Sequence, residues 1–496
     1  MKIKILTLVS FICFYILGVT AMYSQDKGFL LLGGGSNPIQ NQVSIEYNAK
    51  FFLRSIKNLG FNSPVKTFYS DGNAPTKDIQ IAIDDTKREK VNHLLSIFLK
   101  GNKGLKYEYR NNEIEGNTGP CKIDKITKAL DELMQSDNKS NFVSFFGHGH
   151  GGKSEGRKGT TFVTYGEKGL KVNQFSRILN KQKIDRPLTL FMTQCYSGGF
   201  ADIIFIDGNS SYGLSPKPRC GFFSTVHYRQ STGCTTAVDN PDYVDYGSMF
   251  WAAMSGTDQF GKKFKQPDYN DDGKTTMLEA HAYTIIHAKT IDIPFKTSDR
   301  LLEHFSIERD PKKLSDNIDK SNYEDLLKNT DAIQKAILTS LAKTCELGPK
   351  GDIKTFRANT KKLTEKIAKM SKEYYVSSKK RYSSIIRIKK DILSKWPTLN
   401  NPWNSNCKEI IDNNEDEIVT LIENHKAQKV LKELDKKNEK LKNKLETMKY
   451  QEAFNMRLLN TYKSIYLENE LKEKGSDELK TYLEKIKTLE ENALGS

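Results

Sequence analysis

Residues 188–200 read LTLFMTQCYSGGF and join an apolar run to a sharp turn. The run from Leu188 to Met192 is typical of a strand buried on both faces of a parallel sheet. Cys195 follows the run, and small residues that let the backbone turn come next: Ser197, Gly198 and Gly199. A structural cysteine usually lies inside an apolar run, whereas a thiol just beyond a strand stands where a nucleophile is needed. This stretch therefore raises the hypothesis of a catalytic thiol.

Strands and helices alternate on both sides of this stretch. Apolar runs indicate strands within residues 28–37, 65–73, 141–146, 160–166 and 186–195. Helical spacing of apolar residues indicates helices at 41–60, 122–135 and 172–182. The alternation predicts an α/β fold with a mostly parallel sheet flanked by helices. Functional sites in such sheets gather at the carboxyl ends of the strands.

A second motif lies at such an end. Residues 147–152 read GHGHGG and directly follow the strand expected at 141–146. A thiol attacks an acyl carbon as thiolate, so it needs a nearby base, which is usually histidine. His148 precedes Cys195 by 47 residues, and a helical crossover would bring both loops to one sheet edge. A histidine at a strand end is normally a surface or capping residue, but its pairing with Cys195 reverses that preference.

These two motifs, FGHG at 146–149 and TQCYSGG at 193–199, resemble those of caspase-fold cysteine peptidases, most of all the legumain-like branch. The resemblance covers roughly residues 27–290, and it implies a caspase-like sheet. It also implies that Cys195 is the nucleophile and His148 the general base and acid, with His150 as the competing base. Backbone N–H groups of Gly149 and Cys195 would form the oxyanion hole.

The family also suggests further site residues. Asn37 is a candidate for orienting the histidine, and Gln194 is a candidate for contact with substrate. The segment CGFFSTVHYRQSTGC at 220–234 resembles the strand that walls the first specificity pocket. Its side chains that would face substrate are Ser224, His227 and Arg229. An exposed hairpin strand is the equal alternative for this segment.

Two departures from the family bear on specificity. Relatives that cleave after basic residues carry an acidic residue two places before the cysteine, where this chain has Thr193. Legumains read asparagine with an arginine near the first helix, but SNPIQNQ at 36–42 has none. Neither a preference for Arg or Lys nor one for Asn is therefore supported.

A calcium-type motif lies in PDYNDDGKTTMLEAHAY at 267–283. Gly273 makes the turn of the pattern D-x-[DN]-x-[DN]-G-x5-E. The expected oxygen ligands are Asp268, Asn270, Asp272, the Lys274 carbonyl, Thr276 and Glu279. The alternative is an acidic turn that caps a helix at 277–289 without metal. We expect any Ca²⁺ here to be structural and expect no cofactor for catalysis.

The first 21 residues have the pattern of a secretory signal peptide. Lys2 and Lys4 precede an apolar run, and small residues end at Ala21. The run is shorter than the roughly 20 residues of a spanning helix, and an uncleaved anchor is the minor alternative. We expect a secreted or periplasmic protein with no transmembrane span once the signal is removed.

Export permits disulfides. Cys13 leaves with the signal, so six cysteines remain in the mature chain. Proximity in sequence suggests two pairs, Cys220 with Cys234 and Cys345 with Cys407.

The 496-residue chain changes character near residue 310, where Lys, Glu, Asn and Leu become dominant. We divide it into a signal peptide (1–21), a caspase-like domain (26–309), a linker (310–330) and a helical region (331–496). Helical spacing at 363–374 and steps of three and four at 431–448 predict a bundle or a short coiled coil. Pro397 and Pro402 mark the turn between the two long helices.

The net charge of +16 has two interpretations. Solvated helix faces are the plainer one, and attraction to an anionic partner is the other. We expect no nucleic-acid partner. The helical region is expected to be a docking or self-association module, with an inhibitory prodomain as the alternative.

These observations favour an exported cysteine endopeptidase that acts on polypeptides through an acyl-enzyme. The alternative is a non-catalytic scaffold or binding protein with the caspase fold, acting through its helical C-terminal region.

Overall fold

The computed structural model describes residues 27–84, 89–99, 104–152, 154–181, 185–233, 236, 244–347, 351–401 and 403–494. The expected signal segment 1–21, Cys234 and Pro402 lie outside the described residues. Within those ranges no helix is both long enough and apolar enough to cross a bilayer.

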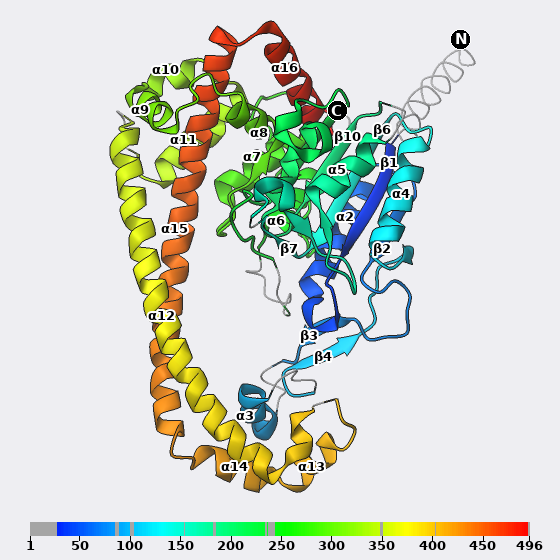
Figure 1. Cartoon of the computed structure of the whole chain (residues 1–496), viewed down its shortest axis with the longest axis vertical. Coiled ribbons are helices and arrows are strands. Elements are labelled where there is room, and N and C mark those ends of the chain that lie inside the picture. The colour runs from blue at the N-terminus through cyan, green and yellow to red at the C-terminus, as the bar shows by residue number, and fades with distance from the viewer. Residues whose placement is uncertain are drawn as a thin grey trace, which may run out of the picture.

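A seven-stranded sheet forms the centre of the chain (Figure 1). Its order is β12-β11-β10-β6-β1-β2-β5. All neighbours are parallel except β12 and β11, which are antiparallel. The strands are β1 (Lys27–Gly34), β2 (Val65–Tyr69), β5 (Asn117–Gly119), β6 (Ser140–Gly147), β10 (Leu188–Met192), β11 (Arg219–Phe223) and β12 (Phe295–Lys296).

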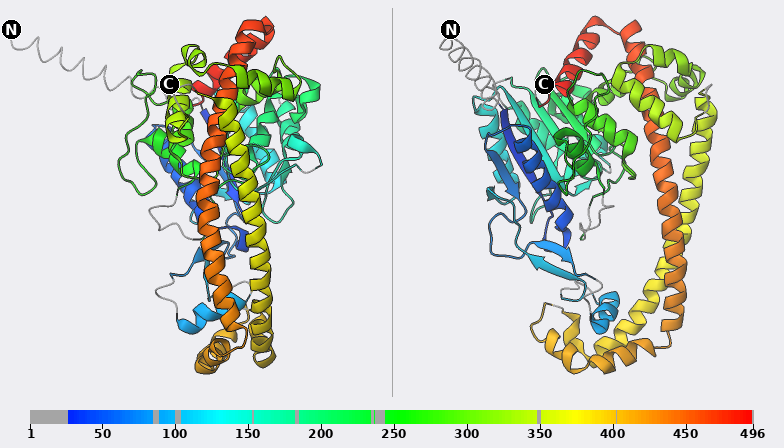
Figure 2. Two further views of the ribbon diagram at one scale, coloured as in Figure 1. Left: turned by 90° about the vertical axis from the view of Figure 1, so that its left-hand side faces the viewer. Right: turned by 180° about the vertical axis from the view of Figure 1, so that it is seen from behind.

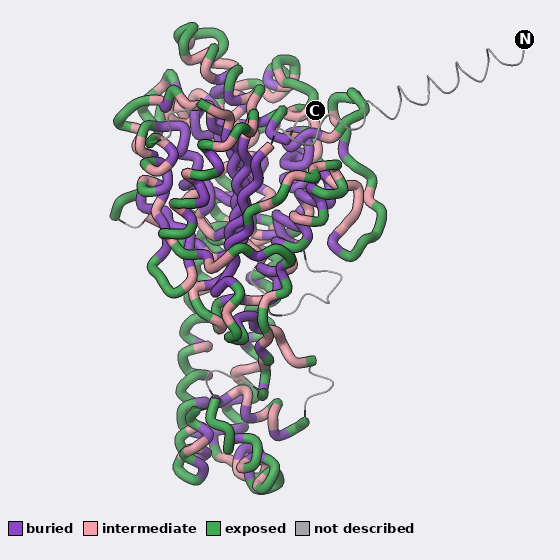
Figure 3. Tube along the Cα trace, turned by 90° about the vertical axis from the view of Figure 1, so that its right-hand side faces the viewer, coloured by how far each residue is buried: buried purple, intermediate pink, exposed green. Residues whose placement is uncertain are grey.

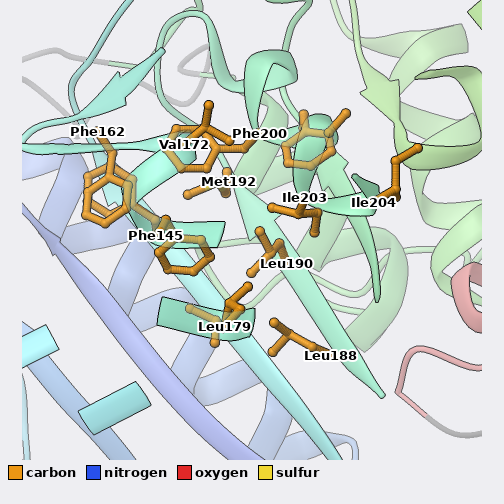
Figure 4. Packing of buried hydrophobic residues seen from close by; sticks show 14 of the residues in the cluster. Phe145, Phe162, Val172, Leu179, Leu188, Leu190, Met192, Phe200, Ile203 and Ile204 are labelled. Carbon is orange, nitrogen blue, oxygen red and sulfur yellow. The ribbon is translucent and has the colours of Figure 1, made fainter. Parts of the chain in front are cut away.

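Helices cover both faces of the sheet because its strands are apolar on both sides. Along β6, Phe142 and Phe146 join one core cluster, whereas Val143 and Phe145 join the other. The first cluster packs under α2 (Val43–Asn58), α6 (Tyr246–Ser255) and α7 (Met277–His287), and the second under α4 (Ile123–Gln135) and α5 (Val172–Asn180). Figure 4 shows part of the second cluster, in which Phe145 packs near Met192.

Two smaller sheets lie outside this core. The strands β3 (Ile79–Ala82) and β4 (Tyr107–Arg110) form an antiparallel hairpin, and α3 (Lys90–Phe98) lies between them in the chain. The strand expected at 160–166 lies in a three-stranded sheet made of β7 (Gly149–His150), β8 (Thr161–Phe162) and β9 (Leu170–Lys171).

Helices continue the chain beyond the sheet. The stretch treated above as a linker, 310–330, forms α9 (Pro311–Lys320) and α10 (Tyr323–Lys328), and both pack into a core cluster. The others are α8 (Thr297–His304), α11 (Ala332–Thr344), α12 (Ile353–Lys395), α13 (Cys407–Asn413), α14 (Glu415–Glu423), α15 (Gln428–Lys474) and α16 (Asp477–Glu491).

The helices α12 and α15 lie side by side as a long antiparallel hairpin, which we call the arm together with α13 and α14 (Figures 1 and 2). The tip of the arm packs on α3, where Lys90 pairs with Glu423 at 2.8 Å. The prediction of an α/β fold with a mostly parallel, helix-flanked sheet and a helical C-terminal region is confirmed.

One expected disulfide is wrong. Cys345 and Cys407 are free thiols. The 43 residues of α12 lie between them in the chain, and a helix of that length spans about 65 Å. Cys220 is also free and is buried in β11.

Candidate active site

The register of the sheet places the two predicted catalytic side chains at one edge. β6 and β10 are parallel neighbours, with Phe145 opposite Met192. His148 and Cys195 each lie three residues beyond this pair. Both therefore follow the carboxyl ends of adjacent strands.

Gly149 lets the two loops touch. A Cβ atom at this position would lie 2.4 Å from the Cys195 carbonyl oxygen and 2.5 Å from Cγ of Gln194. Any side chain would push the loops apart, so the structure requires glycine here. Gly151 also lies close to the second loop, since a Cβ atom added at this position would be 3.0 Å from the ring of Tyr196.

The ring of His148 is held by two acceptors. Its Nε2 lies 2.7 Å from the Gln40 carbonyl oxygen and 2.9 Å from Oε1 of Gln42. Because both partners accept, Nε2 carries the proton in the neutral ring, and Nδ1 is left as the basic atom. Burial lowers the pKa of His148, against the opposing effect of the Gln40 carbonyl.

Sequence reasoning missed both of these glutamines. Asn37, the expected orienting residue, instead accepts from the Gln40 N–H at 3.2 Å and caps the short helix η1 (Pro38–Gln40). A polar turn after a strand carries no local signal of which residue meets a histidine 106 positions away. The competing base His150 lies exposed in β7, opposite Thr161.

Cys195 is half-buried beside Ser231. Its Sγ accepts from the Ser231 N–H at 3.3 Å and lies 3.8 Å from the Ser231 carbonyl oxygen. Burial raises the pKa of the thiol, the Ser231 N–H opposes this, and the charge of Asp292 adds to it. The resting thiol is therefore protonated at neutral pH.

The backbone around the thiol is unusual. Tyr196, directly after Cys195, has φ of +63°, a left-handed conformation that is uncommon and costly for residues other than glycine. The Tyr196 N–H donates to the Arg229 carbonyl at 2.8 Å. Among the described residues, the Cys195 N–H donates to no backbone carbonyl.

The two expected substrate contacts, Gln194 and Ser224, are both buried. Ser224 Oγ lies 3.2 Å from Ser197 Oγ and accepts from Ser231 Oγ at 2.9 Å. Gln194 Oε1 has no hydrogen-bond partner within the described part of the chain. These side chains form a polar layer beneath the loop that carries Cys195.

Asp292 supports the segment that faces the thiol. It is 1% exposed, and its Oδ1 accepts from Ser231 Oγ at 2.9 Å and from the Thr232 N–H at 2.7 Å. Burial raises its pKa to about 6. The sequence gives no sign of this role, because Asp292 lies 61 residues from Ser231.

Arg229 and His227, both expected to face substrate, lie in different surroundings. The Arg229 side chain points to the arm and pairs with Glu452 of α15 at 2.8 Å. Burial lowers the pKa of His227 to about 4, so its ring is neutral at physiological pH.

In the loop expected to bind calcium, the carboxylates accept hydrogen bonds from the loop's own backbone N–H groups. Asp268 accepts from the N–H groups of Asp272 and Gly273, each at 3.0 Å. Glu279 is fully buried and accepts from the Tyr269 N–H at 2.6 Å. These bonds hold the loop in its turn, and each carboxylate oxygen keeps a second lone pair.

The same loop caps α7. Thr276 Oγ1 accepts from the Glu279 N–H at 3.3 Å, and Glu279 accepts from the Thr276 N–H at 2.9 Å. Across the described ranges, no three His, Cys, Asp or Glu side chains gather in a way suited to a metal ion. Thr276 and Glu279 thus form the capping box of α7, and the predicted ligands Asn270 and Lys274 are exposed.

No protein-family model matches this chain, and a search of curated proteins finds no match.

Proposed function

We propose that this protein is a cysteine endopeptidase that hydrolyses peptide bonds with Cys195 as nucleophile and His148 as base. The observation that carries the proposal is the placement of the two residues beyond paired strands, with His148 Nε2 anchored on Gln40 and Gln42. The resemblance of the two motifs to legumain-like peptidases supports the same assignment.

The chemistry follows from these groups. His148 Nδ1 takes the thiol proton as Sγ bonds to the carbonyl carbon of the scissile peptide. The oxyanion is stabilised by the N–H groups of Gly149 and Cys195, at about 3 kcal/mol for each donor. The ring then gives its proton to the leaving amine, and a thioester remains. Water, deprotonated by the same ring, attacks the thioester and releases the carboxylate product and the thiol.

The resting pair is a neutral thiol and a neutral imidazole, because burial raises one pKa and lowers the other. We therefore expect a broad plateau in kcat/KM against pH. Its acid limb lies below the ordinary histidine pKa of about 6.5, since protonated His148 accepts no proton. Its alkaline limb lies above the ordinary cysteine pKa of about 8.5. A resting ion pair would instead place the acid limb at a lowered cysteine pKa and the alkaline limb at a raised histidine pKa.

The direct test uses the purified mature protein and a fluorogenic peptide library. Cys195→Ala should abolish turnover, and His148→Ala should reduce kcat by about 10³-fold or more. Cys407→Ala, at a thiol in the tip of the arm, is the matched control and should leave turnover unchanged. Turnover that persists in Cys195→Ala would refute the assignment.

One observation favours a second candidate, a non-catalytic scaffold or binding protein. The Ser231 backbone packs against the thiol that would attack the substrate. A thiol-directed acyl probe separates the two candidates. Equal labelling of the wild type, Cys195→Ala and His148→Ala would point to the scaffold.

Export and calcium binding also remain proposals. The N-terminal segment supports export to the periplasm or beyond, which cell fractionation tests. Calcium at loop 268–279 would raise Tm relative to the protein in chelator, because binding stabilises the folded state alone. An unchanged Tm would leave the loop as a helix cap.

A further inference from the structure

Two side chains of α15, Glu452 and Arg457, contact residues that support the Cys195 site. Arg229 lies in the segment that faces Cys195, and its guanidinium donates to Glu452 Oε2 at 2.8 Å. The other oxygen of Glu452 accepts from Thr364 of α12 at 2.7 Å. The carboxylate is 8% exposed, so it is held between three elements and largely out of water. These contacts join residues 223 positions apart.

The Arg229 backbone connects this clamp to the nucleophile. Its carbonyl accepts from the Tyr196 N–H at 2.8 Å. Tyr196 is the left-handed residue that directly follows Cys195. Fixing the Arg229 side chain therefore also fixes an acceptor that holds the turn of the nucleophile.

Arg457 makes a second connection from the same helix. It is 2% exposed and donates to the carbonyls of Ile285, Ala288, Thr290 and Asp292 and to the Thr290 hydroxyl. Asp292 in turn holds Ser231 and Thr232 against the thiol. α15 thus supports the segment 229–232 in two ways: Glu452 holds Arg229, and Arg457 holds Asp292, which in turn holds Ser231 and Thr232.

We propose that Glu452 is a positioning residue for the Cys195 site, acting through Arg229, so that the arm helps to set the geometry of the site. This inference rests on the proposed peptidase function and deepens it. A partner that moves α15 relative to the sheet would change the reactivity of the thiol through these contacts.

The experiment uses the full-length protein and the variant Glu452→Gln, which removes the charge and keeps the shape. Glu446→Gln is the matched control, because Glu446 is an exposed residue of the same helix. Active sites are titrated with an acyl probe, so that kcat and KM refer to folded protein only. We expect Glu452→Gln to lower kcat/KM per titrated site by about tenfold or more, mainly in kcat. The reversed pair Arg229→Glu with Glu452→Arg should restore part of the loss.

A value within about twofold of the wild type, or a loss explained entirely by fewer titrated sites, would overturn the proposal. The rate of Cys195 alkylation by iodoacetamide gives a readout that needs no substrate. If the wild type cleaves no peptide, the proposed function fails, yet an altered alkylation rate in Glu452→Gln still supports positioning. An unchanged alkylation rate in that case would reject it.

Discussion

The two halves of α15 lie in different surroundings although they belong to one unbroken helix. Between residues 428 and 448 four side chains are buried, whereas between 452 and 471 ten are buried. Figure 3 shows the same contrast, with buried residues concentrated around the sheet and exposed ones along the distal arm. The proximal half (452–471) packs against the sheet-bearing domain, whereas the distal half (428–448) belongs to the hairpin with α12, whose tip packs on α3.

The largest expected effect comes from truncation near residue 310, which removes every helix from α9 onward, including the arm and α16. Leu467, Leu471, Leu483 and Ile486 belong to the core cluster that covers one face of the sheet. Without them, apolar surface is exposed and the sheet-bearing domain should not fold. Far-UV circular dichroism and probe labelling of Cys195 measure this.

The alternative of an inhibitory prodomain predicts the opposite outcome. A truncated protein that is folded and has raised turnover would support inhibition. It would also show that the proximal half of α15 is dispensable, which would remove the contrast between the halves.

Arg457→Met tests the proximal half at one residue. Its donors satisfy five acceptors, and burial lowers the Arg457 pKa to about 10, so the group stays charged at neutral pH. Leaving buried carbonyls unpaired should lower the free energy of unfolding by about 4 kcal/mol. Arg387→Met, at an exposed arginine of α12, should change it by less than about 0.5 kcal/mol. Similar urea midpoints for both variants would contradict the prediction.

Leucine truncations compare the two halves directly. Leu458 is 0% exposed in the proximal half, and Leu445 is 5% exposed in the distal half. Leu458→Ala should lower the free energy of unfolding by about 3 kcal/mol, because rigid neighbours on several elements leave a cavity. Leu445→Ala should cost about 1 kcal/mol, since a two-helix seam can collapse. Equal costs in urea unfolding would mean that the halves are packed alike.

The sequence predicts the parts of this molecule whose signals are local. The strand ends at His148 and Cys195 stand out because glycines interrupt apolar runs, and the helical spacing of Ile126, Leu130 and Leu133 places α4. The main sheet and the juxtaposition of the two motifs follow from these patterns together with the crossover rule.

The supports of the site are not predictable in this way. Gln42 reaches His148 and Glu452 reaches Arg229 across more than a hundred residues, and neither pairing leaves a periodic pattern. The two halves of α15 also share one spacing of apolar residues. That spacing shows which face is buried but not whether a single helix or a whole domain covers it.

The smallest expected effect lies in the distal seam and has the opposite sign. Asn438 is 7% exposed at a position between Leu431 and Leu445, and its Oδ1 has no hydrogen-bond partner among the described residues. Asn438→Leu removes this unpaired oxygen and adds apolar contact, so it should raise the free energy of unfolding by about 1 kcal/mol. Thermal melting of the variant against the wild type measures the gain. A loss of stability would mean that the amide fixes the register of the hairpin, as a single polar seam residue does in paired helices, and the distal half would then be specified more strictly than its exposure suggests.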